Sequence, residues 1–214
     1  MAVIGITGGA GSGKSFVAKL AAENFDMLHI DTDKLARTQM MPGGASYAGV
    51  AEAFPECLVH GKNVPEIDRA ALAARVFNDK EALEKLESLT HPHVRETVES
   101  LIESSKGLFS HVLIETAILA DAGYCPICDA VWFVTAPDED RKKRLIERGY
   151  DEARIKSVFE SQPTEERYRE TSSYEIKNGE GADEENIIGQ IKEILNKMGI
   201  PEISAEEDED PDDE

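Results

Sequence analysis

The chain has 214 residues, 41% of them hydrophobic, which suits one compact α/β domain with insertions. Its 43 acidic and 23 basic residues give a net charge of −20, which disfavours nucleic acid as the main ligand because no basic face offsets the repulsion from phosphate groups. Runs of about 18 apolar residues are absent, so the sequence predicts no membrane span and no membrane partner.

The two ends of the chain differ in character. The first residues read directly as a strand and a glycine-rich loop, which leaves no room for a targeting peptide and predicts a cytoplasmic protein. Residues 202–214 hold nine acidic residues and no Lys or Arg. Such a segment cannot bury enough apolar surface to fold, so we predict that residues 201–214 form a disordered acidic tail.

A glycine-rich motif follows the first predicted strand. Residues 8–15 read Gly-Gly-Ala-Gly-Ser-Gly-Lys-Ser, the complete G-x-x-x-x-G-K-S phosphate-binding loop, between an apolar run and an apolar-patterned helix. Backbone N–H groups of such a loop surround phosphates, Lys14 would reach the β- and γ-phosphate oxygens, and the Ser15 hydroxyl would ligate Mg²⁺. The sequence therefore predicts a nucleoside triphosphate site. The loop residues assigned to it are Gly11, Ser12, Gly13, Lys14 and Ser15.

Five short apolar runs predict the strands of one sheet. Three of them are almost continuously apolar, as expected for parallel strands covered on both faces. Helical patterns separate the runs, which indicates a doubly wound five-stranded parallel α/β sheet. The predicted strands are 3–6, 27–30, 112–114, 131–134 and 174–176, and a last helix is predicted over 184–197.

One connection is too long to be a simple crossover. About 80 residues separate the second and third predicted strands, where a βαβ unit needs about 30 in all. We predict a helical insert over 33–106, with helices at 69–77, 80–89 and 92–105, that binds the second substrate. The core of a single domain, residues 1–200, would then consist of 1–32, 107–137 and 170–200.

The segment 138–169 holds the main concentration of arginine in the chain. Beside the carboxyl ends of the strands it would form a helical lid over the triphosphate. On spacing alone, a solvated helix face with pairs such as Asp140 and Arg144 explains the pattern equally well. The phosphate loop favours the lid, because phosphoryl transfer needs cations around the transferred group.

Two carboxylates follow the second predicted strand. Asp31 and Asp33 are two residues apart, and in a strand such residues face the same side. Both would then point into the crevice at the carboxyl edge of the sheet, where ligands bind in this fold class. One can orient a hydroxyl group or hold the water shell of the metal, and Asp33 can accept the proton of the hydroxyl. The alternative is that Asp33 only caps a helix over 34–39.

The three cysteines give a weaker signal. An odd number of cysteines in a chain predicted to be cytoplasmic favours free thiols. Cys125 and Cys128 have C-x-x-C spacing, but one such pair supplies only two of the four ligands of a structural zinc. We interpret them as two small, half-buried thiols, with a redox pair as the alternative.

Further segments match one known family. From Val3 to about Ile194 the chain closely resembles the dephospho-CoA kinases, which catalyse the last step of coenzyme A biosynthesis. Many families share the phosphate loop, whereas the Asp-x-Asp-x-x-Ala-Arg segment, the His-Pro pair and the lid pattern, in this order, are more specific. The matching segments are 6–15, 30–37, 67–69, 76–77, 89–92, 144–148, 161–162 and 177–179.

The resemblance implies a reaction with ATP as the co-substrate and Mg²⁺. The γ-phosphoryl group of ATP would pass to the ribose 3′-hydroxyl of dephospho-CoA, giving CoA and ADP. Asp33 matches the carboxylate of the family that accepts the hydroxyl proton, and Asp31 would support it on the substrate side. Lys14 and Arg148 would complete the catalytic set.

The resemblance also assigns the lid and the acceptor side. Arg144 and Arg148 match lid arginines that neutralise the charge of the triphosphate, and Asn178 would lie near the adenine of ATP. Arg37 and His91 would contact the acceptor.

The His-Pro pair has a purely structural interpretation of equal weight. In that interpretation Thr90 is the N-cap of a new helix and Pro92 lies in its first turn.

Several positions depart from the family pattern. Phe16 stands where a small residue is common, so it either stacks near the nucleotide, as we assign it, or enters the core. Asp121 replaces a glutamate, Val158 stands where the lid often has an arginine, and Ser172-Ser173 replace Ala-Asp. These departures affect individual contacts of the lid and the acceptor loop and leave the main site intact.

Two other functions compete with this assignment. The first is another small-molecule kinase with the same loop, acting on a nucleoside or nucleotide. The second is a nucleotide-dependent switch without catalysis, but residues 196–199 lack the aspartate of a guanine-binding motif, and both Lys14 and Asp33 are present. We expect a monomer or a weak homo-oligomer.

Overall fold

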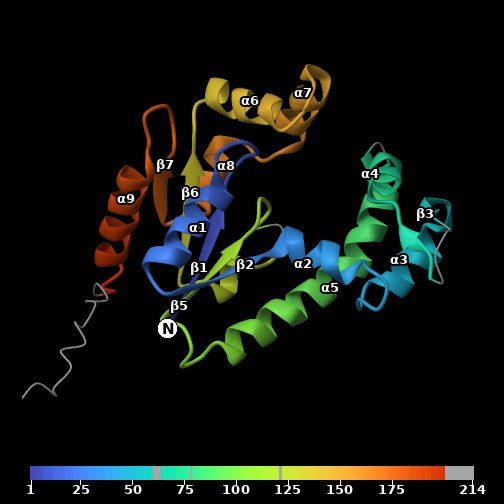
Figure 1. The fold of residues 1–214 in the computed structure, drawn as a ribbon, viewed down its shortest axis with the longest axis horizontal. Helices are drawn as coiled ribbons and strands as arrows, with labels where there is room; N and C mark the ends of the chain where they lie inside the picture. The colour runs from blue at the N-terminus through green and yellow to red at the C-terminus, as the bar shows by residue number, and fades with distance from the viewer. Residues whose placement is uncertain (60–63, 78, 121, 201–214) are drawn as a thin grey trace, which may run out of the picture.

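A five-stranded parallel sheet forms the centre of the molecule (Figure 1). The structure is a computed structural model, and it describes residues 1–59, 64–77, 79–120 and 122–200. All five predicted strands are confirmed, and so is the doubly wound α/β architecture. In spatial order the strands are β2 (Met27–Asp31), β5 (His111–Glu115), β1 (Ala2–Thr7), β6 (Ala130–Thr135) and β7 (Tyr174–Lys177).

Helices cover both faces of the sheet, which explains why β1, β5 and β6 are almost continuously apolar. Helices α1 (Lys14–Asn24) and α9 (Glu184–Lys197) cover one face, where Ile4, Ile6 and Trp132 are buried. Helix α5 (Lys80–Ser104) covers the other face, against Val3 and Val112. The bounds predicted for α9 are those observed.

The strand order places β1 next to the point where the winding reverses. From β1 the chain crosses past β5 to β2, and from β5 it returns past β1 to β6. In open sheets of this kind, ligands bind outside the carboxyl ends of the strands at such a reversal. Residues 8–13, which join β1 to α1, lie there.

The helical insert stands beyond the β2 edge of the sheet, on the right in Figure 1. It has a small apolar core of its own, which includes Val50, Phe54 and Leu72. Its two strands were not predicted, because two residues are too few to show an alternating pattern. Its elements are α2 (Thr32–Gln39), α3 (Tyr47–Ala53), the 3-10 turn η1 (Pro55–Cys57), β3 (Leu58–Val59), β4 (Glu66–Ile67), α4 (Arg69–Phe77) and the first part of α5.

The long helix α5 corrects one prediction. Two helices were expected, at 80–89 and 92–105, but a single helix spans the whole segment with Pro92 inside it. A proline in a helix costs about 3 kcal/mol, because it removes a backbone hydrogen bond and crowds the preceding turn. Val94 and Val98 are buried in the core under the sheet, and this packing keeps the helix continuous. Thr90 is therefore not an N-cap, and its hydroxyl donates to the carbonyl of Leu86.

Three helices follow β6 and make up the segment predicted to be a lid, above the carboxyl ends of the strands (Figure 1). They are α6 (Asp138–Glu147), α7 (Glu152–Ser161) and α8 (Glu165–Glu170). Asp151 and Thr164 cap α7 and α8 by accepting backbone N–H groups of the first turn. The ring of Tyr168 on α8 stacks on Phe133 of β6 with 5.1 Å between centroids, which ties the end of the lid to the sheet.

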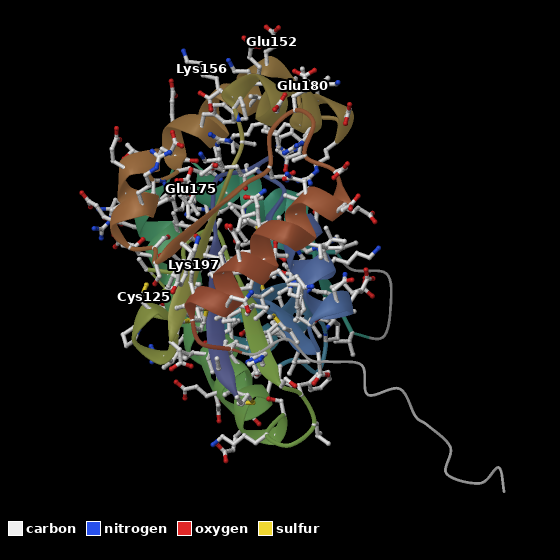
Figure 2. All side chains as sticks on the ribbon, turned by 90° about the vertical axis from the view of Figure 1, so that its left-hand side faces the viewer. Cys125, Glu152, Lys156, Glu175, Glu180 and Lys197 are labelled. Carbon is white, nitrogen blue, oxygen red and sulfur yellow. The ribbon has the colours of Figure 1, made fainter. Side chains whose placement is uncertain are left out.

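Cys57 and Cys128 are free thiols, and Cys125 forms no disulfide bond. Cys125 begins the 3-10 turn η2 (Cys125–Ile127), and its position is labelled in Figure 2. Burial, and then the charge of Cys125, raises the pKa of Cys128 to about 12, so this thiol stays protonated and unreactive. The structure thus favours the interpretation of two half-buried thiols.

Two expectations lie outside the described residues: the acidic tail at 201–214 and the departure at Asp121. In the part of the chain that the structure describes, no helix is long and apolar enough to span a membrane.

Candidate active site

The glycine-rich loop joins the central strand β1 to helix α1. Gly13 is the N-cap of α1 and has a φ of 92°, which favours glycine. A Cβ on Gly13 would collide with the Asn178 carboxamide, and one on Gly11 would lie 2.6 Å from the carbonyl oxygen of Arg141. Glycine therefore lets the lid and the segment after β7 approach the loop. The first N–H groups of α1 lack partners in the helix and make the loop an anion site.

Lys14 lies against the loop that precedes it. Its Nζ donates to the carbonyl oxygens of Gly8, at 2.7 Å, and Gly9, at 3.2 Å. Burial lowers the pKa of Lys14 to about 8, while the charges of Glu115 and Asp33 act in the opposite direction. Both carboxylates thus lie within electrostatic range of the lysine.

Ser15 meets a carboxylate that sequence reasoning did not assign. The Ser15 hydroxyl donates to Oε1 of Glu115 at 2.6 Å, and Oε2 of Glu115 is 2.9 Å from Nε2 of His29. Burial opposes the ionisation of Glu115, but the hydrogen bonds from His29 and Ser15 outweigh it and hold its pKa below the ordinary value. The sequence feature that could have assigned Glu115 to the site is an acidic residue at the end of a buried strand, next to the strand that carries the loop.

The Asp31–Asp33 pair is arranged differently from the prediction. Asp31 ends β2 and caps α2, because its Oδ1 accepts the N–H of Lys34 at 2.9 Å. Asp33 lies in the first turn of α2, so it is neither on the strand nor the cap. The pKa of Asp33 is raised by desolvation and then by repulsion from Asp31, while Lys14 and Arg37 act in the opposite direction. The two carboxylates still lie close together beside the loop.

Arg144 joins three segments around the loop. Its Nη1 donates to the carbonyl oxygens of Gly11 and Ser12, at 3.1 and 3.2 Å, and its Nη2 donates to that of Asn178 at 2.9 Å. The Asn178 amide in turn donates to the Ser12 carbonyl at 2.8 Å. Within the described residues Arg144 makes no ion pair with Asp140, so the interpretation of this pair as a solvated helix face is wrong.

Two further lid residues contact the loop without having been given a role. Arg141 Nε donates to the carbonyl of Ala10 at 3.0 Å, and Gln162 Oε1 accepts the N–H of Ala10 at 2.8 Å.

Arg148 ends α6 and lies close enough to Lys14 for its charge to lower the pKa of that lysine. Among the described residues, its guanidinium has no hydrogen bond or ion pair, so it is free to meet a phosphate.

A cavity of about 1010 Å³ lies beside the loop. Gly9 and Ser12 line it on the loop side, and Pro137 and Gly179 line it on the side of the segment that contains Asn178. Glu175 and Glu180, which also line it, are labelled in Figure 2. The cavity has room for a nucleotide and adjoins the segment assigned to the adenine.

The residues assigned to the acceptor lie on two neighbouring helices of the insert. Helix α2 packs against α5, where Gln39 Nε2 donates to Thr97 Oγ1 at 2.6 Å. Arg37 is exposed in the last turn of α2, and its charge acts on Asp33. His91 is half-buried and lines a separate cavity of about 540 Å³. The structure thus brings Arg37 to Asp33, whereas His91 belongs to the surface of α5.

The departures from the family pattern lie around the site. Phe16 is 36% exposed, so it does not enter the core, and it does not line the large cavity. Val158 is half-buried on α7. Ser173 exchanges hydrogen bonds with the backbone of Val131 and so extends the pairing of β7 with β6.

The residues beside the loop suit a metal that arrives with a nucleotide. No group of three His, Cys, Asp or Glu side chains among the described residues could hold a metal ion by itself. The Ser15 hydroxyl and the Glu115 carboxylate are hard oxygen donors. Mg²⁺ typically binds through one or two such protein groups, substrate phosphates and water.

Comparison with known proteins decides the family. A family model described as dephospho-CoA kinase matches residues 2–184. The dephospho-CoA kinase of Moorella thermoacetica is 40% identical over 150 residues, which are 69% of each chain. The chain belongs to the dephospho-CoA kinase family. It is therefore a transferase with ATP as its co-substrate, and the resemblance found in the sequence is confirmed.

Solved structures agree with this fold. The crystal structure of TT1252 from Thermus thermophilus has a TM-score of 0.77 and 30% identity, over 92% of this chain and 97% of that one. Dephospho-CoA kinase from Campylobacter jejuni has a TM-score of 0.61 and 23% identity, over 92% and 96%. The latter likeness shows the fold alone.

Proposed function

We propose that this kinase transfers the γ-phosphoryl group of ATP to the ribose 3′-hydroxyl of dephospho-CoA, giving CoA and ADP. The observation that supports this most is that Asp33 and Lys14 lie within electrostatic range of each other beside the loop. The lysine belongs to the phosphate site, the aspartate lies at the start of the insert, and their charges act on each other. Donor and acceptor would meet between these two side chains.

The phosphate loop holds the donor in this proposal. The phosphates of ATP would lie against the N–H groups of the loop. The Lys14 ammonium would turn from the Gly8 and Gly9 carbonyls to the phosphate oxygens, and Arg148 would add a second cation. The adenosine would occupy the cavity beside Asn178. Ser15 would hold a Mg²⁺ ion bound with ATP, and that ion would supply neutralisation of the negative charge of the phosphates.

Asp33 would act on the acceptor. A carboxylate that hydrogen-bonds the 3′-hydroxyl orients its oxygen toward the γ-phosphorus and takes its proton as the new bond forms. Burial and Asp31 raise the pKa of Asp33, which makes it a better proton acceptor than an isolated aspartate. Arg37, exposed nearby, would pair with the acceptor's own phosphates, and His91 would lie further along the insert.

The lid would exclude water from the transfer. Arg141, Arg144 and Gln162 already join α6 and the end of α7 to the loop. Water that reached the γ-phosphate would hydrolyse ATP, and a closed lid prevents this while it positions the reactants in line.

Initial rates of ADP release with ATP and Mg²⁺ test the acceptor. We expect strong release with dephospho-CoA, a product with the mass of CoA, and release near the background rate with adenosine, AMP or other nucleosides. A preference for a nucleoside or nucleotide would replace the proposed acceptor and support another small-molecule kinase. Omission of Mg²⁺ should abolish transfer, and full activity in EDTA would refute the metal assignment.

A further inference from the structure

A histidine lies beside the carboxylate that ends strand β5. Nε2 of His29 is 2.9 Å from Oε2 of Glu115, and the other oxygen of Glu115 accepts the Ser15 hydroxyl at 2.6 Å. The His29 side chain is 24% exposed and that of Glu115 is 7% exposed. The three side chains form a continuous row from the edge strand of the sheet to the first turn of α1. The transfer step described above gives no role to His29 or Glu115.

The sheet register explains why the two side chains meet. His29 pairs with Leu113 and Asp31 pairs with Glu115, so His29 and Glu115 are diagonal neighbours on one face of the sheet. On this face Met27 and Leu113 belong to the apolar core beneath α1. On this face of β2, His29 lies between Met27 and Asp31, within hydrogen-bond reach of the carboxylate.

The hydrogen bonds of Glu115 show what His29 contributes. A buried carboxylate requires partners for both oxygens. Ser15 satisfies Oε1, and among the described residues only His29 hydrogen-bonds Oε2. Without His29, the carboxylate would be free to turn toward the Lys14 ammonium, whose charge already acts on it. The hydrogen bond to Ser15 would then lose its fixed direction.

We propose that His29 is a positioning residue for metal–nucleotide binding: it holds Glu115 so that the Ser15 hydroxyl keeps its lone pairs directed toward the Mg²⁺ ion of the nucleotide. The inference rests on the proposed function, in which Ser15 holds that ion. Removal of a group that hydrogen-bonds to a metal ligand, without binding the metal itself, typically lowers metal affinity by about 10–100-fold. The effect of His29 should therefore appear in the metal dependence of nucleotide binding.

Calorimetric titration of ADP into the full chain, once with Mg²⁺ and once with EDTA, measures this dependence. The ratio of the two dissociation constants is the gain that the metal provides. His29→Leu should lower this ratio about tenfold, with the constant in EDTA unchanged. His29→Gln, whose amide nitrogen can still donate to Glu115, should keep most of the gain. A purely structural role would predict no such rescue.

A matched control lies at the start of β5, the strand that ends in Glu115. Nδ1 of His111 accepts the backbone N–H of Ala2 at 3.2 Å, away from the loop. His111→Leu should leave the ratio at its wild-type value. Should His29→Leu not fold, His29→Asn replaces it, because the shorter amide keeps the polarity but does not reach Glu115.

The outcomes separate this inference from the proposed function. An unchanged ratio in His29→Leu, or a loss in His29→Gln as large as in His29→Leu, would overturn the role of His29 while leaving the metal assignment standing. The absence of any Mg²⁺-dependent gain in the wild type would overturn both. A loss confined to the variants that cannot donate to Glu115 would support the inference.

Discussion

The phosphate loop and the acceptor side of the site differ in how firmly the protein holds them. Arg141, Arg144, Gln162 and Asn178 all hydrogen-bond to the backbone of the loop. By contrast, Arg37 is exposed, and Asp33 has only electrostatic neighbours among the described residues.

This difference matches the two substrates. A triphosphate always presents the same oxygens, so in the proposed function a largely preformed cradle of N–H groups and cations suits it, and the Lys14 ammonium turns toward it when it binds. In the proposed function the acceptor must enter, be oriented and leave, so the side chains assigned to it lie on the insert, where the substrate would supply their contacts. Changes in the loop should therefore impair ATP binding, and changes on the insert should impair use of the acceptor.

The largest effect on the donor half is expected from Lys14→Ala. Loss of a cation that stabilises the developing charge should lower kcat by about 10²–10³-fold, and the KM for ATP should rise. Steady-state kinetics with varied ATP measure both. Lys19→Ala is the matched control, because Lys19 lies on the same helix with its side chain exposed and paired with Glu23. Equal losses in the two variants would show that the effect comes from the helix and not from the site.

The addition of a single methyl group to the loop should also weaken ATP binding. In Gly13→Ala the side chain would meet the Asn178 carboxamide, and the positive φ would cost about 1–2 kcal/mol. We expect the dissociation constant of ATP to rise about tenfold or more, measured by calorimetry. Gly189→Ala, in open space on α9, should leave binding unchanged and stabilise the fold slightly. Wild-type affinity in Gly13→Ala would show that the loop is not held closely.

On the acceptor side, Arg37→Gln should change the KM for dephospho-CoA and not the affinity for ATP. Loss of one charge-assisted contact should raise the KM for dephospho-CoA by about tenfold, while the KM for ATP stays the same. Arg69→Gln, an exposed arginine at the start of α4, is the control. A rise in the KM for ATP instead would place Arg37 on the donor half.

The smallest expected effect is on the pH profile. Asp33 must be deprotonated to accept a proton, so kcat/KM should fall as the pH falls through the pKa of Asp33 in the free enzyme. Burial, and then Asp31, raises that pKa, so the acid limb should lie above the ordinary value of 3.8. Asp31→Asn removes the repulsion and keeps the helix cap, so it should move the acid limb to lower pH. A limb that does not move would exclude Asp33 as the titrating group.

The sequence predicted the fold because its signals were local. The apolar strands and α9 each carried a pattern, cap or stop of their own. Two predictions failed where packing at a distance decided the structure. Pro92 indicated a helix boundary, but the buried Val94 and Val98 carry the helix through it. Asp31 supplies the cap of α2, so Asp33 lies in the first turn of the helix instead of at the end of the strand.

The sequence motif names some residues of the candidate site, whereas the sheet register brings others together. Lys14 and Ser15 follow from the spelling of the loop. Glu115 and His29 do not, because their contact depends on which strand lies beside β5 and in which register. The same holds for Gln162, which reaches Ala10 only after the lid has folded back over the loop.

The most direct test of the separation between the donor and acceptor halves of the site is the single-turnover rate of Asp33→Asn. It is measured at saturating dephospho-CoA over a range of ATP concentrations. We predict a rate constant lower by about 10²–10⁴-fold, with half-saturation at the wild-type ATP concentration. A near-wild-type rate constant would contradict the role of Asp33 as proton acceptor, and a large shift in ATP half-saturation would contradict the separation of the two halves.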